Sequence, residues 1–560
     1  MHMEIDQRSE ECTPQSTTTS TRPASRTSAT RQTWPGGSPD GASGNTSFVR
    51  GRLTSSRFVG RQSQLAELEL AYRETLESDP RLILLSGESG VGKTRLLSEV
   101  RPRFDQALLL QGQCLEQGEL ELPYAPLLGA LRPLVRDRDP ALAELSAGSR
   151  AHLASLLPSL GSPAAGEGSG ADGQMRLFES LLELLHLLSV RQPLVLILED
   201  MHWADRSTRA FAGFLARSMI DERVMVLLSY RSDELHRRHP LRPLLAELSR
   251  LEAARLIELD PFDRDELAEA LTDILGEAPG QDLIDRLLMR TEGNPLYVEE
   301  LLAAALDGRG ATPQSLRDAF MLRIERMSEA AGRAARAVAV GRAMDESMIA
   351  RITGVEPEPL REALREAVAE YVLVADEQGR FGFRHALLRE VVYDDLLPGE
   401  RNAMHLQLAR ELEQTGELAC AEDEAGRVAV IATHYAAAGD QSSALRATIR
   451  AAREAHRVHA YGEMADLYER AHGLWAQVPD AASVAGIDEV ELLQAAANAY
   501  ALSGNHRHSE MFAELGLRLL APQSDPVRYA RLLVRRGRSR WRLNQPSPAM
   551  ADLDQALSGD

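Results

Sequence analysis

Hydrophobic residues follow two different spacings along this chain, and the dominant spacing changes near residue 260. Before that point, short continuous apolar runs alternate with segments in which apolar residues recur every three or four positions. Continuous runs are typical of buried parallel strands, and the longer spacing is typical of amphipathic helices. The expected strands are 82–86, 107–111, 194–199, 224–229 and 256–259. This alternation predicts an α/β domain at 57–260, with a parallel sheet and helices on both sides.

Two helical segments of this domain can be placed in more detail. A first helix is expected over 64–77, and its core-facing positions are Leu65, Leu68, Ala71, Tyr72 and Leu76. A helical insertion is expected between the second and third strands. The stretch 162–173 is rich in Gly, Ser and Ala, and we expect it to interrupt that insertion as a flexible segment.

Beyond residue 260 the pattern is mostly helical, and we expect three further parts. A helical lid is predicted over 261–310, with core positions Phe262, Leu267, Leu271, Ile274, Leu283, Leu287 and Leu301. Residues 311–400 are expected to form three helices and then a hairpin (371–374 and 380–383 around a turn at 376–379), which together predict a winged helix. Residues 401–560 suggest incomplete tetratricopeptide-like repeats, with turns at Gly439-Asp440, Gly504-Asn505 and Asn544. Because the spacing is irregular, a plain helical bundle remains the alternative.

Composition narrows the possible settings and partners. The chain has 560 residues and a net charge of −20, which argues against a generally basic nucleic-acid-binding surface. Its three cysteines are far apart and suggest neither a zinc site nor a disulfide framework, and no apolar run could span a bilayer. Residues 1–56 are rich in Ser, Thr, Gly, Pro and Arg, and we expect a disordered tail without an apolar signal-peptide core. A cytoplasmic protein without membrane contact is predicted.

The most specific motif follows the first expected strand. It consists of Gly87, Glu88, Ser89, Gly90, Val91, Gly92, Lys93 and Thr94, and it fits the phosphate-binding loop pattern at every fixed position. Glycines let backbone N–H groups converge on a phosphate, and the following helix adds the positive end of its dipole. We expect Lys93 to reach the β- and γ-phosphates and Thr94 to bind Mg²⁺. The motif predicts a site for ATP or ADP with Mg²⁺.

The carboxyl ends of two later strands supply the expected partners of this loop. Glu199 and Asp200 end the strand at 194–199, where one carboxylate can serve the metal and the other can polarise the attacking water. Arg231 ends the next strand, and its guanidinium could reach the γ-phosphate. We therefore predict catalytic roles for all three and metal contacts for both acids.

At this point the motifs together resemble a known family. Phe58-Val59-Gly60-Arg61, the phosphate loop, the segment 199–205 (EDMHWAD) and Ser229-Tyr230-Arg231 resemble the signalling ATPases with numerous domains. More narrowly, the chain is similar to the large ATP-binding regulators of the LuxR type. Two later motifs agree with this: the segment 292–300 (EGNPLYVEE) in the lid, and 383–390 (FRHALLRE) after the wing. The resemblance covers the chain from about Phe58 onward.

The resemblance implies roles for further residues. Val59, Gly60 and Arg61 would lie near the adenine and ribose, Pro295 would pack on the base from the lid, and His385 would sense the β-phosphate. Arg231 would be the sensor arginine. The first acid is Glu199 where many relatives have Asp, which leaves the metal ligand open. For His202, Trp203 and Asp205 we expect structural roles, with Trp203 packing and Asp205 capping the next helix.

The resemblance also implies a mechanism. ADP would hold the α/β domain, lid and winged helix closed, and an inducer or protein bound to the repeats would favour exchange for ATP and self-association. Hydrolysis would be slow, as in a switch rather than a metabolic enzyme. The winged helix could in principle bind DNA, although the resemblance assigns it to the switch. DNA binding in this family would otherwise require a C-terminal helix-turn-helix, which we do not find in this chain. Two alternatives remain: an ATP-dependent signalling scaffold that acts through a protein partner, and a small-molecule phosphotransferase, against which the lid, wing and repeats argue.

Overall fold

The computed structural model describes residues 55, 57–114, 122–163, 171–306, 316–376, 378–415 and 424–558. The expected tail at 1–56, apart from Ser55, lies outside these residues, as do Cys12, Cys420 and Glu377 of the expected turn. Cys114 is buried. Among the described helices, none is long and apolar enough to cross a membrane.

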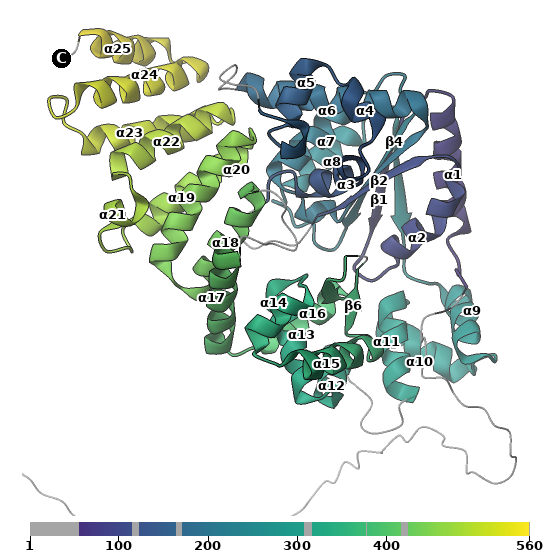
Figure 1. The fold of residues 1–560 in the computed structure, drawn as a ribbon. Helices are drawn as coiled ribbons and strands as arrows, with labels where there is room; N and C mark the ends of the chain where they lie inside the picture. The colour runs from purple at the N-terminus through teal and green to yellow at the C-terminus, as the bar shows by residue number, and fades with distance from the viewer. Residues whose placement is uncertain are drawn as a thin grey trace, which may run out of the picture. The chain divides into compact units, whose positions relative to one another are not determined.

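Residues 57–260, here called the α/β region, are built on a parallel five-stranded sheet (Figure 1). The strands are β1 (Arg81–Gly87), β2 (Leu108–Gln113), β3 (Leu194–Glu199), β4 (Val224–Arg231) and β5 (Ala254–Leu259). Their order is β2-β3-β4-β1-β5, so β4 lies between β1 and β3. All five expected strands are confirmed. The order places Arg231, at the end of β4, between the phosphate loop after β1 and the acids after β3.

The sheet is covered on both faces, because successive residues of a strand point to opposite sides. On β1, Ile83 and Leu85 pack with α1 (Gln62–Leu76) and α2 (Lys93–Val100), whereas Leu82 and Leu84 join the core on the other face. The second face is covered by α3 (Ala125–Arg136), α6 (Ala171–Arg191), α7 (Arg206–Ser218) and α8 (Leu241–Leu248). Shorter helices precede α6: η1 (Arg101–Arg103), α4 (Pro140–Glu144), α5 (Ala147–Leu153) and η2 (Pro158–Leu160).

Two details of this region differ from expectation. Leu76 is 44% exposed, whereas Thr75 is fully buried and donates a hydrogen bond to the Ala71 carbonyl. The buried stripe of α1 therefore continues from Tyr72 to Thr75, because a hydroxyl that is satisfied within its own helix can occupy a core position. In addition, α6 begins at Ala171, so the last part of the stretch expected to be flexible is helical, and 164–170 lie outside the described residues.

The lid consists of α9 (Arg264–Leu275), α10 (Gln281–Thr291) and α11 (Pro295–Leu306) around a small core of its own. Leu267, Leu271, Leu287 and Leu301 are buried in that core, as expected. Four helices then precede the hairpin, one more than expected. They are α12 (Leu316–Arg326), α13 (Glu329–Gly341), α14 (Glu346–Thr353) and α15 (Pro357–Ala369). The hairpin pairs β6 (Leu373–Ala375) with β7 (Phe381–Phe383), and α16 (Ala386–Asp395) completes the winged helix.

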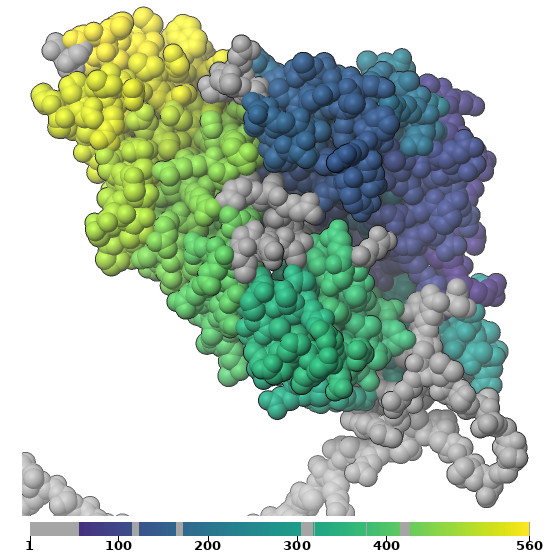
Figure 2. All heavy atoms as spheres, viewed as in Figure 1, coloured from purple at the N-terminus to yellow at the C-terminus, as the bar shows by residue number. Residues whose placement is uncertain are grey.

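The rest of the described chain forms antiparallel helix pairs, here called the repeats, which run from green to yellow in Figure 2. They are α17 (Pro398–Thr415), α18 (Glu424–Ala438), α19 (Gln441–Arg457), α20 (Tyr461–Trp475), α21 (Ala481–Ala485), α22 (Glu489–Leu502), α23 (His506–Leu519), α24 (Pro526–Arg542) and α25 (Pro546–Ser558). Gly439 and Gly504 turn the chain with φ of 78° and 79°, and the following Asp440 and Asn505 cap the next helices.

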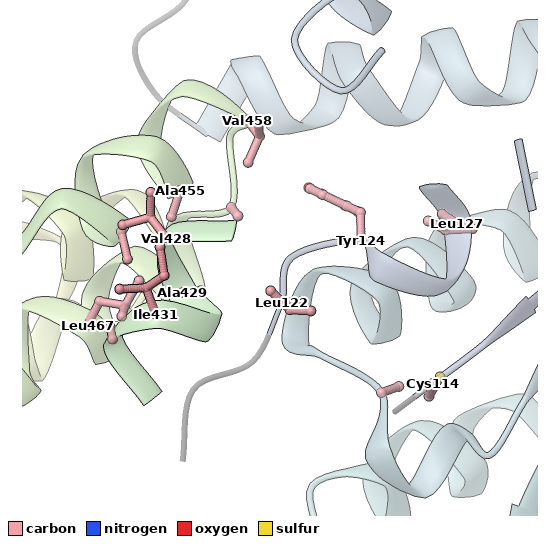
Figure 3. Close-up of a cluster of buried hydrophobic side chains, with 14 of the residues drawn as sticks. Cys114, Leu122, Tyr124, Leu127, Val428, Ala429, Ile431, Ala455, Val458 and Leu467 are labelled. Carbon is pink, nitrogen blue, oxygen red and sulfur yellow. The ribbon is translucent and has the colours of Figure 1, made fainter. Parts of the chain in front are cut away.

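The largest hydrophobic core is shared between the α/β region, the winged helix and the repeats. Figure 3 shows one part of it, where Leu122 and Tyr124 of the α/β region face Ala455 and Val458 of the repeats. Tyr124 is completely buried. This shared core brings the first repeats against the same region that carries the phosphate loop.

Candidate nucleotide-binding site

The phosphate loop leaves the end of β1 and enters α2 at Lys93. Two of its glycines have left-handed backbone angles, with φ of 78° at Gly90 and 105° at Gly92. Side chains other than hydrogen strain such a backbone, and this explains the glycines at these positions. The resulting curl presents backbone N–H groups and the start of α2 on one side, an arrangement suited to an anion.

Lys93 points back into this loop. Its ammonium donates hydrogen bonds to the carbonyl oxygens of Gly87, at 2.7 Å, and Glu88, at 2.8 Å. Burial lowers the pKa of Lys93 to about 8, although the nearby Asp200 raises it. The loop therefore holds a desolvated cation whose charge a phosphate would stabilise.

Glu199 lies behind the loop rather than in the open site. Its carboxylate accepts a hydrogen bond from the Thr94 hydroxyl at 3.1 Å and another from the amide of Gln111 on β2. Burial, and then the neighbouring Asp200, raise the pKa of Glu199. A hydroxyl and a buried carboxylate in contact form the pair expected on the metal side of a phosphate site.

Asp200 takes a different position because the chain turns sharply after β3. Its φ is 58°, and its backbone N–H donates to the Ser229 hydroxyl at 3.1 Å. Its carboxylate accepts a hydrogen bond from Gln113, at the end of β2, at 3.1 Å. The two adjacent acids are thus separated, with Glu199 against Thr94 and Asp200 toward the open side of the site.

Arg231 is held by a buried polar cluster. Its guanidinium lies 4.6 Å from the ring centroid of Trp203 and forms an ion pair with Glu234. Its backbone N–H donates to Nδ1 of His202 at 3.3 Å, and burial lowers the pKa of His202 to about 2. Trp203 therefore packs as expected, and His202 is a neutral ring that supports the end of β4.

The third residue of this signature, Asp205, is the N-cap of α7. It accepts hydrogen bonds from the backbone N–H of Thr208 at 2.8 Å and of Tyr124 at 3.0 Å, and it is 3% exposed. The capping role expected from the sequence is confirmed. Burial raises the pKa of Asp205, and Glu463 from the repeats raises it further.

The lid closes directly on the loop. Asn294 donates a hydrogen bond from its side-chain amide to the Ser89 carbonyl at 2.8 Å, and the Leu296 N–H donates to the Gly90 carbonyl at 3.3 Å. A Cβ atom on Gly90 would lie 2.7 Å from that of Leu296 and 2.9 Å from the Asn294 side-chain oxygen. Gly90 thus serves both the turn and the close approach of the lid.

The segment expected near the adenine joins the α/β region to the lid. Arg61 donates to the Asp260 carbonyl, lies 5.2 Å from the Phe262 ring centroid and pairs with Glu266 at 3.7 Å. Gly60 has φ of 66°, and any Cβ there would collide with the Glu266 side chain. These contacts give Arg61 a structural role at the start of the lid.

These parts surround one cavity of about 890 Å³. Of the expected site residues, it is lined by Val59, Arg61, Ser89, Gly90, Val91, Gly92, Lys93, Thr94, Asp200, Arg231, Pro295 and His385. It is not lined by Gly60, Gly87, Glu88 or Glu199. The lining continues through the winged helix to His405 and His434 of the first repeats.

Most of the α/β region matches a known protein family by sequence. Residues 57–228 match the family described as AAA ATPase domain. The chain is also 26% identical over 463 residues to an uncharacterized protein of Rhizobium meliloti (strain 1021), a match that spans 72% of this chain and 42% of the relative. The chain therefore spans less than half the length of this curated relative.

Two solved structures are similar to the chain at lower sequence identity. A Signal Transduction ATPase with Numerous Domains protein with a tetratricopeptide repeat sensor, from Pyrococcus horikoshii, is 12% identical with a TM-score of 0.43, over 90% of this chain and 78% of that chain. A Walker-type ATPase of Pyrococcus abyssi is 15% identical with a TM-score of 0.30, over 61% of this chain and 99% of that chain.

The residues fit a nucleotide with its metal ion. The cavity falls within the size range of small-molecule sites, and its lining combines the loop, a cation and an acid at the open side. Among the described residues, no group of three or more His, Cys, Asp or Glu could hold a metal by itself. Thr94 and Glu199, in contact at 3.1 Å, are oxygen donors of the kind that Mg²⁺ uses in phosphate sites, where one or two protein ligands act together with phosphate oxygens and water.

Several residues of the site were not found from the sequence. Gln111 and Gln113 bind the two acids, Asn294 binds the loop from the lid, and Asp233 accepts a hydrogen bond from the Ser89 N–H at 3.2 Å. The glutamines could have been suspected, because they are polar residues at the carboxyl end of an expected strand. Asn294 lies in a motif already noted, but its partner is 205 residues away along the chain.

Proposed function

We propose that this protein is an ATP-operated signalling switch whose nucleotide site also controls the packing of the lid, winged helix and repeats. One observation carries the proposal. The cavity at the phosphate loop is lined by Lys93 of the α/β region, Pro295 of the lid, His385 of the winged helix and His434 of the repeats. A ligand that contacts all four parts stabilises their closed packing by its differential affinity for that state.

The chemistry proposed for the site follows from its geometry. Bound ATP would supply the β–γ phosphoanhydride bond, which breaks as water attacks the γ-phosphate and ADP leaves, and Mg²⁺ would be held by Thr94 with Glu199 behind it. Lys93 would donate to the phosphates once its hydrogen bonds to the loop carbonyls are exchanged. Asp200 on the open side would accept a proton from the attacking water, with Gln113 fixing its carboxylate. Arg231 would stabilise charge on the phosphate from between the loop and the acids.

The burial of Arg231 and His385, and the existing partners of Arg231, favour slow turnover and a regulatory role. Arg231 is 8% exposed and already bound to Glu234 and Trp203, so it must change partners before it can reach a phosphate. His385 faces the same cavity, and burial lowers its pKa to about 4, so it is a neutral donor or acceptor there. Both features suit a site that responds to the nucleotide bound.

The resemblance to LuxR-type regulators extends the proposal to the output, which in that family is transcription. The alternative output is a protein partner recruited by the repeats. Reading the gene beyond the codon for Asp560 separates these outputs, because transcriptional output requires a basic helix-turn-helix encoded in the same frame. If no such segment is encoded, the partner-directed output is supported.

The switch itself is tested with two variants and a matched measurement of size. Lys93→Ala should abolish binding of fluorescent ATP and ADP, whereas Asp200→Asn should retain binding and lose hydrolysis by about a hundredfold or more. Light scattering after gel filtration should show a larger assembly with ATP than with ADP, and Asp200→Asn should hold that assembly. Tight nucleotide binding by Lys93→Ala would refute the site. An unchanged size in both nucleotides would refute the switch.

A further inference from the structure

Helix α24 carries seven arginines, and six of them form two sets with opposite surroundings. The first set, Arg528, Arg536 and Arg540, is paired with carboxylates of neighbouring helices. Arg528 binds Asp488 and Asp525, Arg536 binds Glu514 and Asp552, and Arg540 binds Glu510 and Asp552. These ion pairs hold α24 against α22, α23 and α25.

The second set, Arg531, Arg535 and Arg538, lies on another face of α24. Their spacing of four and three residues places them along one side of the helix. None of the three forms a hydrogen bond or ion pair with any described residue through its guanidinium. Arg535 is half-buried, burial lowers its pKa, and the charge that acts on it is that of Arg538. A partly desolvated cation beside a like charge is unfavourable unless an anion joins it.

These arginines line a groove of about 600 Å³ between α22 and α24. Gln494 and Asn498 of α22, one helical turn apart, also line this groove with their side-chain amides. Within the described part of the chain, neither amide has a side-chain hydrogen-bond partner. The groove also has an apolar component, which includes Val534. It thus offers cations, amide donors and acceptors, and some apolar surface to the same ligand.

We propose that the groove between α22 and α24 binds an acidic peptide segment of a partner protein. The charge pattern selects for carboxylates, and the amides match the backbone N–H and C=O groups of an extended chain. From Arg531 to Arg538 the helix rises about 10 Å, which about three or four extended residues span. The segment would therefore present two or three carboxylates closely spaced in sequence. This proposal rests on the proposed function, in which the repeats receive the signal.

The same arginines could attract a nucleic acid, but two observations favour a peptide. The chain has a net charge of −20, which opposes approach of a long polyanion. In the described repeats, the arginines of the groove come from one helix and lie beside two side-chain amides and apolar surface, rather than along an extended basic stripe. A short carboxylate segment matches this local charge with less repulsion from the rest of the protein.

The test uses the full chain and fluorescence anisotropy with a labelled Glu/Ala peptide of about eight residues. Combined Arg531→Gln, Arg535→Gln and Arg538→Gln should weaken binding at least about tenfold, and rising salt should weaken binding to the original protein. The matched control is Arg446→Gln with Arg507→Gln, two exposed arginines of the same repeats that lie outside α24 and outside the groove. It should change affinity less than about twofold. Equal losses in both variants, or no binding of the peptide, overturn the proposal.

A second measurement separates a binding role from a structural one. Arg535→Met keeps the apolar stem and removes the unpaired charge, so the thermal midpoint of the ligand-free protein should rise while peptide binding falls. A lower midpoint would show that Arg535 supports the fold, which contradicts the proposal. Single-stranded DNA of similar charge is the competing probe, and tighter binding of that probe assigns the groove to nucleic acid instead. ATP binding, measured in the same variants, should be unchanged, so failure here is distinguishable from failure of the nucleotide switch.

Discussion

Replacing Glu463 should weaken the packing of the repeats on the α/β region. Glu463 lies on α20 of the repeats, and its side chain binds the start of α7 in the α/β region. Its carboxylate accepts hydrogen bonds from the Ser207 N–H and the Ser207 hydroxyl, each at 2.7 Å, and Glu463 is 3% exposed. Charge-assisted hydrogen bonds contribute about 1.5–3 kcal/mol each. Glu463→Ala also leaves the Ser207 donors without a partner, so we expect a loss of about 3–5 kcal/mol in the packing of α20 on α7.

The conservative variant sharpens this prediction. Glu463→Gln keeps one oxygen acceptor and removes a negative charge that helps to raise the pKa of Asp205. The loss of one charged hydrogen bond is then partly offset by less repulsion between two buried carboxylates. We therefore expect a loss of about half that of Glu463→Ala.

Hydrogen exchange and denaturant unfolding measure the effect. Amides at the start of α7 and in α20 should exchange faster in Glu463→Ala, while β3 and β4 stay protected. Ser207→Ala combined with Glu463→Ala should be less than additive, because both substitutions remove the same hydroxyl contact. Glu358→Ala, at a side chain that is 79% exposed, is the control and should change stability by less than about 0.5 kcal/mol. Unchanged exchange at α7 in Glu463→Ala would refute this account of the contact.

Three further predictions concern other parts of the molecule. Because the pKa of Lys93 is lowered to about 8, the ammonium of the nucleotide-free site loses its charge above pH 8, and ATP affinity should fall there by about tenfold per pH unit. Calorimetry in two buffers should detect proton uptake on ATP binding, and Lys93→Arg should abolish that uptake. Gly90→Ala should weaken nucleotide binding at least about tenfold in a fluorescence titration, because the new Cβ forces the lid away from the loop. Burial lowers the pKa of His405 to about 4 and of His434 to about 3, so the folded chain binds fewer protons than the unfolded chain below pH 6.5. Stability should therefore fall from pH 6.5 toward pH 4, by up to about 3 kcal/mol for His405, and replacing both with Gln should flatten the curve.

Local features of the sequence were sufficient for the five strands, for the strand-to-helix turn that carries the motif at 87–94, and for the turns at Gly439 and Gly504. Each depends on residues close together in the chain, such as the run before Gly87 or the glycines at 439 and 504. The expected burial of Leu76 was wrong because the periodic pattern treated Thr75 as polar and exposed. Its hydroxyl is satisfied by the Ala71 carbonyl, so the core stripe runs through it instead.

Contacts between distant segments could not be predicted in the same way. The Gln113–Asp200 hydrogen bond depends on the parallel register of β2 and β3, which periodicity does not fix. Asn294 meets Ser89 across 205 residues, and Ser207 meets Glu463 across 256. In each case the residue type is common on protein surfaces, so the sequence alone does not mark it. Its hydrogen-bond partner comes close only when the distant segments pack together in the fold.

The contact of Glu463 with Ser207 connects the proposed nucleotide switch with the proposed peptide groove. The segment from Asp200 to Ser207 begins at the proposed water-activating acid, passes His202 and Trp203 beneath Arg231, and ends at the helix start that Glu463 binds. If Arg231 changes partners, its contacts with His202 and Trp203 in this segment change. If the packing of α20 changes, the contact between Glu463 and Ser207 at the other end of the segment changes. If a peptide in the groove alters nucleotide affinity by some factor, ATP must alter peptide affinity by the same factor. Because Glu463 links the two sides, Glu463→Ala should reduce that factor toward one while leaving each ligand's own site intact.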